Sequence, residues 1–188
     1  MQGKVMIFSA PSGSGKSTVV HHLLSLHPEF EFSVSAASRA PRGEEKDGVD
    51  YWFISKEEFE RLIREDALVE WQQVYAGHYY GTLKREVERI WSKGHVILFD
   101  VDVKGGVNLK KYFGDAALSV FVKAPSVEEL RRRLIGRRTD SPEEIEVRIS
   151  KAEEEMTYAD KFDYVLVNDN LEKALAEAEK VTDEFLQK

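Results

Sequence analysis

Residues 9–18, SAPSGSGKST, carry the residue types of a phosphate-binding loop. The pattern Gly-x-x-x-x-Gly-Lys-Ser/Thr is met at Gly15, Lys16 and Ser17, while Ala10 stands in place of the first glycine. The apolar run KVMIF precedes the stretch, and the helix-like segment VVHHLLSL follows it. Such a loop turns backbone N–H groups and the positive end of a helix toward an anion; a Gly/Ser turn that matches by chance is the alternative. We expect phosphates to bind along Ala10, Pro11, Ser12, Gly13, Ser14, Gly15, Lys16, Ser17 and Thr18.

Three side chains near this loop suit a nucleotide and its metal ion. Lys16 has the length to reach a γ-phosphate, and the Ser17 hydroxyl is a ligand that Mg²⁺ accepts. Asp100 ends the apolar run VILFD, where a carboxylate could hold Mg²⁺ through water; a simple turn acid is the alternative. The five histidines lack metal-ligand spacing, and the chain has no cysteine. A metal site made only of protein side chains, a disulfide and a thiol nucleophile are therefore not expected.

The elements that must hold these residues are those of an α/β protein. Nearly continuous apolar runs predict strands that are buried on both faces, as in a parallel sheet covered by helices. They lie at residues 4–9, 96–101, 118–124 and 164–168. Helical segments alternate with these runs, and Ser-x-x-Glu patterns predict capping boxes that begin at Ser55, Ser126 and Ser141. Residues 33–83 break the alternation and predict an antiparallel or irregular insertion.

The composition favours one globular domain. The chain has 188 residues, of which 42% are hydrophobic and 32% charged, and its net charge is -7. This charge argues against a general attraction to nucleic acid or to anionic membranes. The sequence shows neither a signal peptide nor a long apolar span, so we expect a cytoplasmic protein without membrane or nucleic-acid partners. Both a monomer and a homodimer remain open.

Eight blocks spread over nearly the whole chain resemble the guanylate kinase family. In order they are SAPSGSGKST, FSVSAASRAPR, DGVDYWF, LVEW, GHYYGT, LFDVDVKGG, LRRRLIGR and FDYVLVND. The resemblance implies transfer of the γ-phosphate of ATP to GMP, giving ADP and GDP, with Mg²⁺ as the metal. It also implies a P-loop NTPase-type parallel sheet flanked by helices, made from residues 1–32, 84–124 and 160–188. A mixed GMP-binding region would be inserted at 33–83 and a helical lid at 125–159.

The resemblance assigns the acceptor site to dispersed residues. Guanidinium forks and phenolic hydroxyls suit a dianionic monophosphate, and carboxylates suit the N1–H and N2–H₂ donors of guanine. The matching positions for the GMP phosphate are Arg39, Arg42, Tyr51 and Tyr80. For the base, Glu70 and Asp102 would accept from the ring nitrogens, while Ser35 and Thr82 would face O6. Read singly, Arg39 and Arg42 could equally be solvated loop charges, and Glu70 could be a surface residue.

Three of the arginines at 131–148 are expected to act on the donor nucleotide, while Arg131, Arg132 and Arg138 are expected to be surface charges. By resemblance, Arg133, Arg137 and Arg148 belong to a lid that reaches the triphosphate as the site closes, and Asn168 lies near adenine. The expected catalytic residues are Lys16, Arg42, Arg137 and Arg148. For Arg133, a helix-surface ion pair with Glu129 is the competing interpretation.

Three departures from the family pattern remain. Arg42-Gly43-Glu44-Glu45 displaces the usual glycine, which leaves the role of Glu45 open. The segment QQVYAGH is one residue longer than usual, and GRRT replaces the lid sequence GRGT. Two other functions also remain: a non-catalytic module that binds a phosphorylated partner, and a P-loop kinase for another nucleoside monophosphate.

Overall fold

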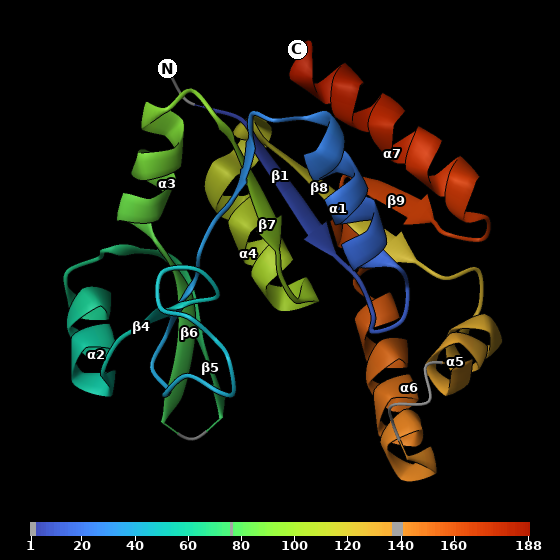
Figure 1. Cartoon of the computed structure of the whole chain (residues 1–188), viewed down its shortest axis with the longest axis horizontal. Helices are drawn as coiled ribbons and strands as arrows, with labels where there is room; N and C mark the ends of the chain where they lie inside the picture. Colours follow the sequence, from blue (N-terminus) through green and yellow to red (C-terminus); the bar gives the residue numbers. More distant parts are fainter. Residues whose placement is uncertain (1–2, 76, 137–140) are drawn as a thin grey trace.

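A five-stranded parallel sheet forms the centre of the molecule in the computed structural model, which describes residues 3–75, 77–136 and 141–188 (Figure 1). The strand order is β2-β7-β1-β8-β9. The strands are β1 (Val5–Ser9), β2 (Phe30–Phe32), β7 (Val96–Asp100), β8 (Ala117–Lys123) and β9 (Tyr164–Val167). Four of them confirm the predicted runs. The sequence does not predict β2, because an edge strand with one neighbour tolerates Glu31 and lacks a continuous apolar run.

Helices cover both faces of this sheet. Met6 and Phe8 point toward α1 (Lys16–Leu26) and α7 (Leu171–Leu186), while Val5 and Ile7 point toward α3 (Lys84–Ser92) and α4 (Val103–Phe113). Side chains alternate along a strand, so a strand that is apolar throughout must be covered twice. Each of these four side chains is at most 1% exposed, and burying one contributes about 1.5–3 kcal/mol. Short 3₁₀ helices η1 (Gly114–Ala116) and η2 (Ala159–Lys161) precede β8 and β9.

The insertion predicted at 33–83 is a second, mixed sheet. Its strands are β3 (Ala36–Ala37), β4 (Trp52–Phe53), β5 (Leu68–Tyr75) and β6 (His78–Leu83), in the order β4-β3-β6-β5. The β3–β4 pair is parallel, and β3–β6 and β5–β6 are antiparallel. Helix α2 (Lys56–Arg64) buries Phe59 and Leu62 against this sheet. We call residues 33–83 the acceptor lobe, after the role that the sequence analysis expects of them.

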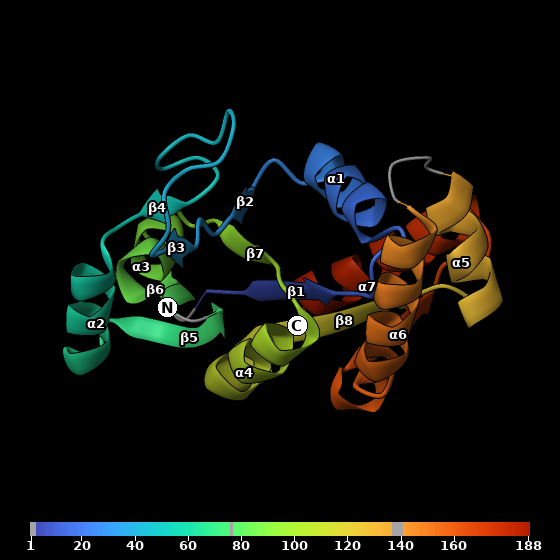
Figure 2. The ribbon, with the colours of Figure 1, turned by 90° about the horizontal axis from the view of Figure 1, so that it is seen from below.

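The acceptor lobe and two further helices flank the end of the central sheet at which β1 and β7 finish. Figure 2 shows the lobe on one side and α5 (Val127–Gly136) with α6 (Pro142–Met156) on the other. Parallel strands bring the loops after their carboxyl ends to one edge of the sheet, and ligands of α/β proteins bind at this edge. The phosphate loop after β1 and the segment after β7 therefore meet between the two flanking parts. Within the described residues, no helix is both long and apolar enough to cross a bilayer.

The predicted capping of the helix starts is confirmed only in part. The hydroxyls of Ser55, Ser126 and Ser141 each accept a hydrogen bond from the backbone N–H three residues later. A reciprocal capping box forms at Ser141, where the Glu144 carboxylate accepts from the Ser141 N–H at 2.7 Å. The boxes predicted at the other two serines are wrong, because their glutamates bind arginines of the same helix. These pairs are Glu58 with Arg61, and Glu129 with Arg132 and Arg133.

Candidate active site

The loop of residues 10–18 takes its shape from two glycines and an asparagine. Gly13 and Gly15 have φ of +92° and +93°, a region that side-chain-bearing residues rarely adopt. The Asn168 amide donates to the Ser14 carbonyl at 2.9 Å, and a Cβ on Gly15 would lie 2.2 Å from Asn168 Nδ2. Ala10 has no positive φ, so its replacement of the first consensus glycine needs no left-handed backbone. The loop therefore leads into α1 with its amides fixed.

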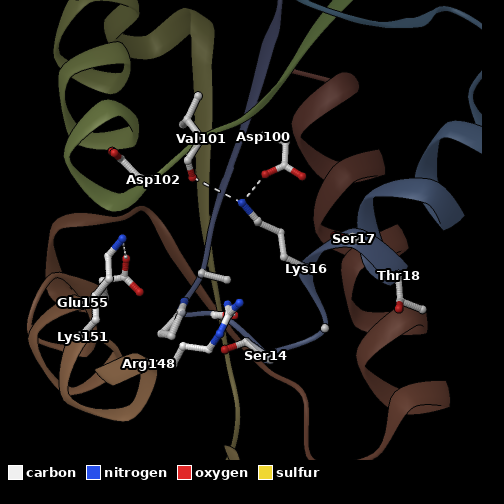
Figure 3. A pocket seen from close by; sticks show the side chains of 15 residues that line it. Ser14, Lys16, Ser17, Thr18, Asp100, Val101, Asp102, Arg148, Lys151 and Glu155 are labelled. Atoms are coloured by element: carbon white, nitrogen blue, oxygen red, sulfur yellow. Dashed lines mark hydrogen bonds and ion pairs between the residues drawn. The ribbon is translucent and has the colours of Figure 1, made fainter. Parts of the chain in front are cut away.

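This loop lines a cavity of about 420 Å³, which we call the donor cavity (Figure 3). The remaining wall comes from the end of β7, the segment after it and α6: Asp100, Val101, Asp102, Arg148, Lys151 and Glu155. The Lys16 ammonium forms an ion pair with Asp100 and donates to the Val101 carbonyl at 3.4 Å. Lys16 is thus held at the cavity by a partner that a phosphate oxygen could replace.

The donor cavity offers few protein ligands for a metal ion. Ser17 supplies a hydroxyl and Asp100 a carboxylate, both hard oxygen donors of the kind Mg²⁺ takes. No group of three or more His, Cys, Asp or Glu side chains within the described residues could hold a metal by itself. The donor set therefore fits an ion that arrives with a nucleotide and keeps phosphate and water ligands, as Mg²⁺ does.

The arginines expected in the lid occupy different places. Arg148, on α6, donates to the Ser12 hydroxyl at 3.0 Å and lines the donor cavity. Arg133, on α5, donates to the Asn168 carbonyl at 2.8 Å and to Glu129 at 2.7 Å. It lines a neighbouring cavity of about 410 Å³ together with Asn168 and Thr18. Arg137 lies outside the described residues.

Two donor-cavity residues escape the sequence analysis. Lys151 and Glu155 stand on the same helix as Arg148, and Lys151 Nζ lies 3.7 Å from Glu155 Oε1 (Figure 3). Burial raises the pKa of the Glu155 carboxyl above its usual range. Positions 148, 151 and 155 are three and four apart and share one helix face, so helical spacing from Arg148 would have found both residues.

A second cavity of about 340 Å³, the acceptor cavity, lies on the lobe side of the same segment. It shares Asp100, Val101 and Asp102 with the donor cavity. Its other lining residues are Ser35, Arg39, Arg42, Tyr51, Glu70, Gln72, Tyr80, Gly81 and Gly105. The residues predicted for an acceptor are thus brought together, Asp102 from the core and the others from the lobe, except Thr82, which does not line the cavity but donates to Glu70.

Arg39 is held rigidly in the acceptor cavity. Its Nη1 and Nη2 donate to the two Glu45 oxygens at 2.6 and 2.8 Å, and its Nε donates to the Tyr80 hydroxyl at 2.9 Å. The guanidinium also lies 5.0 Å from the centre of the Tyr51 ring, and only 7% of the side chain is exposed. Hydrogen bonds from Arg39 and from the Arg42 backbone lower the pKa of Glu45 to about 2. Arg42 itself is exposed, so its side chain can change conformation more easily than that of Arg39.

Two carboxylates stand at the opposite wall of the acceptor cavity. The Thr82 hydroxyl, which is fully buried, donates to Glu70 Oε1 at 2.9 Å. Burial, reinforced by the nearby charge of Asp102, raises the pKa of Glu70 to about 7. Asp102 caps α4 by accepting from the Gly105 N–H at 2.7 Å, and it remains exposed. One carboxylate is therefore desolvated and the other is fixed by a helix.

Comparisons with known proteins agree on one family. The family model described as guanylate kinase matches residues 2–185. The guanylate kinase of Bacteroides thetaiotaomicron is 56% identical over 188 residues, covering 100% of this chain and 92% of that protein. The guanylate kinase of Porphyromonas gingivalis is 50% identical over 98% of this chain and 99% of its own. A crystal structure of guanylate kinase from Anaplasma phagocytophilum aligns with a TM-score of 0.72 at 30% identity, over 97% of this chain and 85% of that one. The chain therefore belongs to the guanylate kinase family of ATP-dependent phosphotransferases.

Proposed function

We propose that the protein transfers the γ-phosphoryl group of ATP to GMP, producing ADP and GDP. One observation carries this proposal: the donor and acceptor cavities share the wall made by Asp100, Val101 and Asp102. Phosphoryl transfer requires the attacking and leaving oxygens to lie roughly in line on either side of one phosphorus. Two cavities that open on a common wall allow two nucleotides to meet end to end.

On the donor side, the backbone amides of residues 12–17 would hold the β-phosphate. Lys16 would leave Asp100 for an oxygen of the transferred group, and Arg148 would exchange the Ser12 hydroxyl for a phosphate oxygen. Ser17 and Asp100 would hold Mg²⁺, which when bound neutralises charge that develops on the phosphate oxygens. We assign Arg133 and Asn168 to the neighbouring cavity, where the nucleoside of ATP would lie, and Arg137 to the closing lid.

On the acceptor side, Arg39 would donate hydrogen bonds to the GMP phosphate through the guanidinium N–H that its present partners leave unused. The hydroxyls of Tyr51 and Tyr80 would bind the same phosphate. Arg42 is exposed and would turn onto the phosphate as the lobe closes. A phosphate dianion is itself the nucleophile, so this chemistry needs no general base. Positioning and charge stabilisation are then the main contributions of the protein.

The base of the acceptor would be selected by carboxylates. Guanine offers N–H groups at positions 1 and 2, which Glu70 and Asp102 can accept, and we assign Ser35 and Thr82 to its O6 edge. Adenine presents an unprotonated N1 at the same place and would leave a carboxylate unpaired. Each unsatisfied group costs about 1–3 kcal/mol, so GMP should be preferred strongly over AMP.

The division of the chain follows from these roles. We propose a core made of residues 1–32, 84–124 and 160–188, a GMP-binding region at 33–83 and a lid at 125–159, with the last two closing over both nucleotides. Closure would exclude water that would otherwise consume ATP. We place this reaction in the cytoplasm, and residues of a single chain line both cavities.

A coupled assay with ATP, Mg²⁺ and each of GMP, AMP, CMP and UMP tests the proposal. We expect rapid formation of GDP and at least about 100-fold lower kcat/KM with AMP. Folded protein that makes no GDP would exclude the proposed reaction. Equal use of AMP and GMP would instead indicate a kinase for another monophosphate. Calorimetry distinguishes the non-catalytic alternative, which predicts no binding of ATP although Lys16 and Arg148 line the donor cavity.

A further inference from the structure

Gln72 makes a contact that no part of the proposed function explains. Its Nε2 donates to Asp102 Oδ1 and Oδ2 at 3.3 and 3.2 Å. Gln72 stands on β5 in the acceptor lobe, whereas Asp102 starts α4 in the core. The two side chains together separate the acceptor cavity from a third cavity of about 250 Å³ behind them. The contact is thus a bridge between the two parts of the molecule at the wall of the acceptor site.

The position of Gln72 in the sheet points the side chain toward this wall. Glu70 and Gln72 are two residues apart on β5, so their side chains share one face of the strand, and both line the acceptor cavity. Gln73, the next residue on the strand, lines the third cavity but neither the donor cavity nor the acceptor cavity. On this face, β5 therefore supplies the Glu70 carboxylate and the Gln72 amide to the acceptor cavity.

The chemistry of an amide suits this place. An ionised carboxylate only accepts hydrogen bonds, and an amide nitrogen donates them without adding charge. Asp102 Oδ1 is already held by the Gly105 N–H at 2.7 Å, so Gln72 restrains the same carboxylate from a second direction. Gly105 also packs closely here, because a Cβ added to it would lie 3.3 Å from Asp102 Oδ1 and 3.6 Å from Gln72 Nε2. Asp102 is left with little freedom to rotate.

We propose that Gln72 is a positioning residue for the guanine-binding carboxylate Asp102 and, through it, a determinant of acceptor selectivity. This inference rests on the proposed function, because it gives Gln72 a role only if Asp102 recognises the acceptor base. The amide fixes the carboxylate plane before GMP arrives, so the acceptor does not have to order that side chain on binding. Gln72 acts in binding rather than in the transfer step, because it lines only the acceptor side of the shared wall.

The test compares Gln72→Met with Gln73→Met in the full-length protein. Methionine keeps the length of glutamine but removes the donor, and Gln73 serves as the matched control. We expect Gln72→Met to raise the KM for GMP and the calorimetric Kd about tenfold, which corresponds to about 1.4 kcal/mol. The KM for ATP and kcat should change less than threefold, and Gln73→Met should match the unmodified protein. Gln72→Ala, which should behave like Gln72→Met, provides a second variant if methionine disturbs the strand.

A double-mutant cycle with Asp102→Asn tests whether Gln72 acts through Asp102. Asparagine retains helix capping, so the fold should survive and the comparison remains one of binding. In the Asp102→Asn background, adding Gln72→Met should change the KM for GMP less than twofold. A full tenfold loss in that background, or no loss from Gln72→Met alone, would overturn the inference. If Asp102→Asn alone left GMP use unchanged, recognition of guanine by Asp102 would fail, and the positioning role would fail with it.

Discussion

The donor and acceptor cavities are built by different means. One continuous run, residues 10–18, forms most of the donor wall with backbone amides fixed by Gly13 and Gly15. The acceptor wall consists of side chains drawn from positions 35 to 105, held by other side chains such as Glu45 and Thr82. Substitution by any residue other than proline leaves a backbone N–H in place, whereas almost any substitution can remove part of a side-chain site. We therefore expect the donor cavity to depend on a few residues for catalysis and the acceptor cavity to lose selectivity stepwise.

The largest effect is expected at Lys16. Lys16→Met removes the one side-chain cation that the phosphate loop itself contributes to the donor cavity. Loss of a preorganised group of this kind should lower kcat on the order of 10³-fold. The dissociation constant for GMP should stay within about twofold, since Lys16 does not line the acceptor cavity.

Lys173→Met, on the exposed side of α7, is the matched control and should retain full activity. Steady-state kinetics and GMP calorimetry on both variants separate the two cavities. A parallel loss of GMP binding in Lys16→Met would show that the cavities are not independent.

The next effect concerns the acceptor side. Glu45→Gln replaces one carboxylate oxygen of the paired contact with an amide, so the Arg39 guanidinium loses its fixed orientation. Because charge-assisted paired hydrogen bonds fix the geometry of a guanidinium, their loss should raise the KM for GMP by roughly tenfold. The KM for ATP should not change.

Glu44→Gln is an unusually close control, because Glu44 is the exposed neighbour of Glu45. It should leave the KM for GMP unchanged. Kinetics in which the two variants behaved alike would indicate that the loop, rather than the Glu45–Arg39 pair, determines affinity for the acceptor.

The contrast between the cavities also explains how much the sequence could predict. A phosphate loop is contiguous and depends on backbone geometry, so the spacing of Gly15, Lys16 and Ser17 between a strand and a helix is enough to identify it. The buried strands follow from apolar runs in the same way, and β2 is missed because it lies at the edge of the sheet. Local pattern is therefore sufficient where neighbours in sequence are neighbours in the site.

The side-chain contacts of the acceptor cavity could not be predicted locally. Glu45 reaches Arg39 because the loop between them turns, with Gly43 at a φ of +55° just before it, and no residue spacing signals that contact. Gln72 meets Asp102 across 30 positions and two parts of the fold. The resemblance to a family named most of the residues that line the acceptor cavity, but it did not name Gln72, and it left the role of Glu45 open.

Protonation of Glu70 predicts that the affinity for GMP, at the acceptor cavity, depends on pH. With a pKa of about 7, Glu70 is mostly protonated at pH 6 and mostly ionised at pH 8, and guanine N–H groups need the ionised form. The Kd for GMP should therefore decrease about tenfold from pH 6 to pH 8. Glu70→Gln should retain only the dependence that comes from the GMP phosphate, whose own pKa is about 6. Calorimetry at several pH values checks both.

The same group affects folding stability with the opposite sign. Between its ordinary pKa of 4.5 and about 7, Glu70 keeps its proton in the folded protein while the unfolded chain has lost it. The free energy of unfolding should therefore decrease as pH rises through this window. Denaturation of Glu70→Gln should show a smaller decrease in the free energy of unfolding over the same pH range. An identical pH profile for both proteins would mean that the Glu70 pKa is not raised.

The smallest expected effect compares the helices that support each cavity. Ser141 starts α6, which carries Arg148, with a reciprocal capping box, whereas Ser55 starts α2 in the acceptor lobe with a single cap bond. Ser141→Ala should cost about 1 kcal/mol and lower Tm by about 2–4 °C, and Ser55→Ala somewhat less. Because α6 borders the donor cavity but not the acceptor cavity, Ser141→Ala should raise the KM for ATP about twofold and leave the KM for GMP unchanged. Ser55→Ala should change neither KM, since α2 borders neither cavity. A rise in the KM for GMP with Ser141→Ala would show that α6 also orders the acceptor site, and the two cavities would then be one cooperative unit.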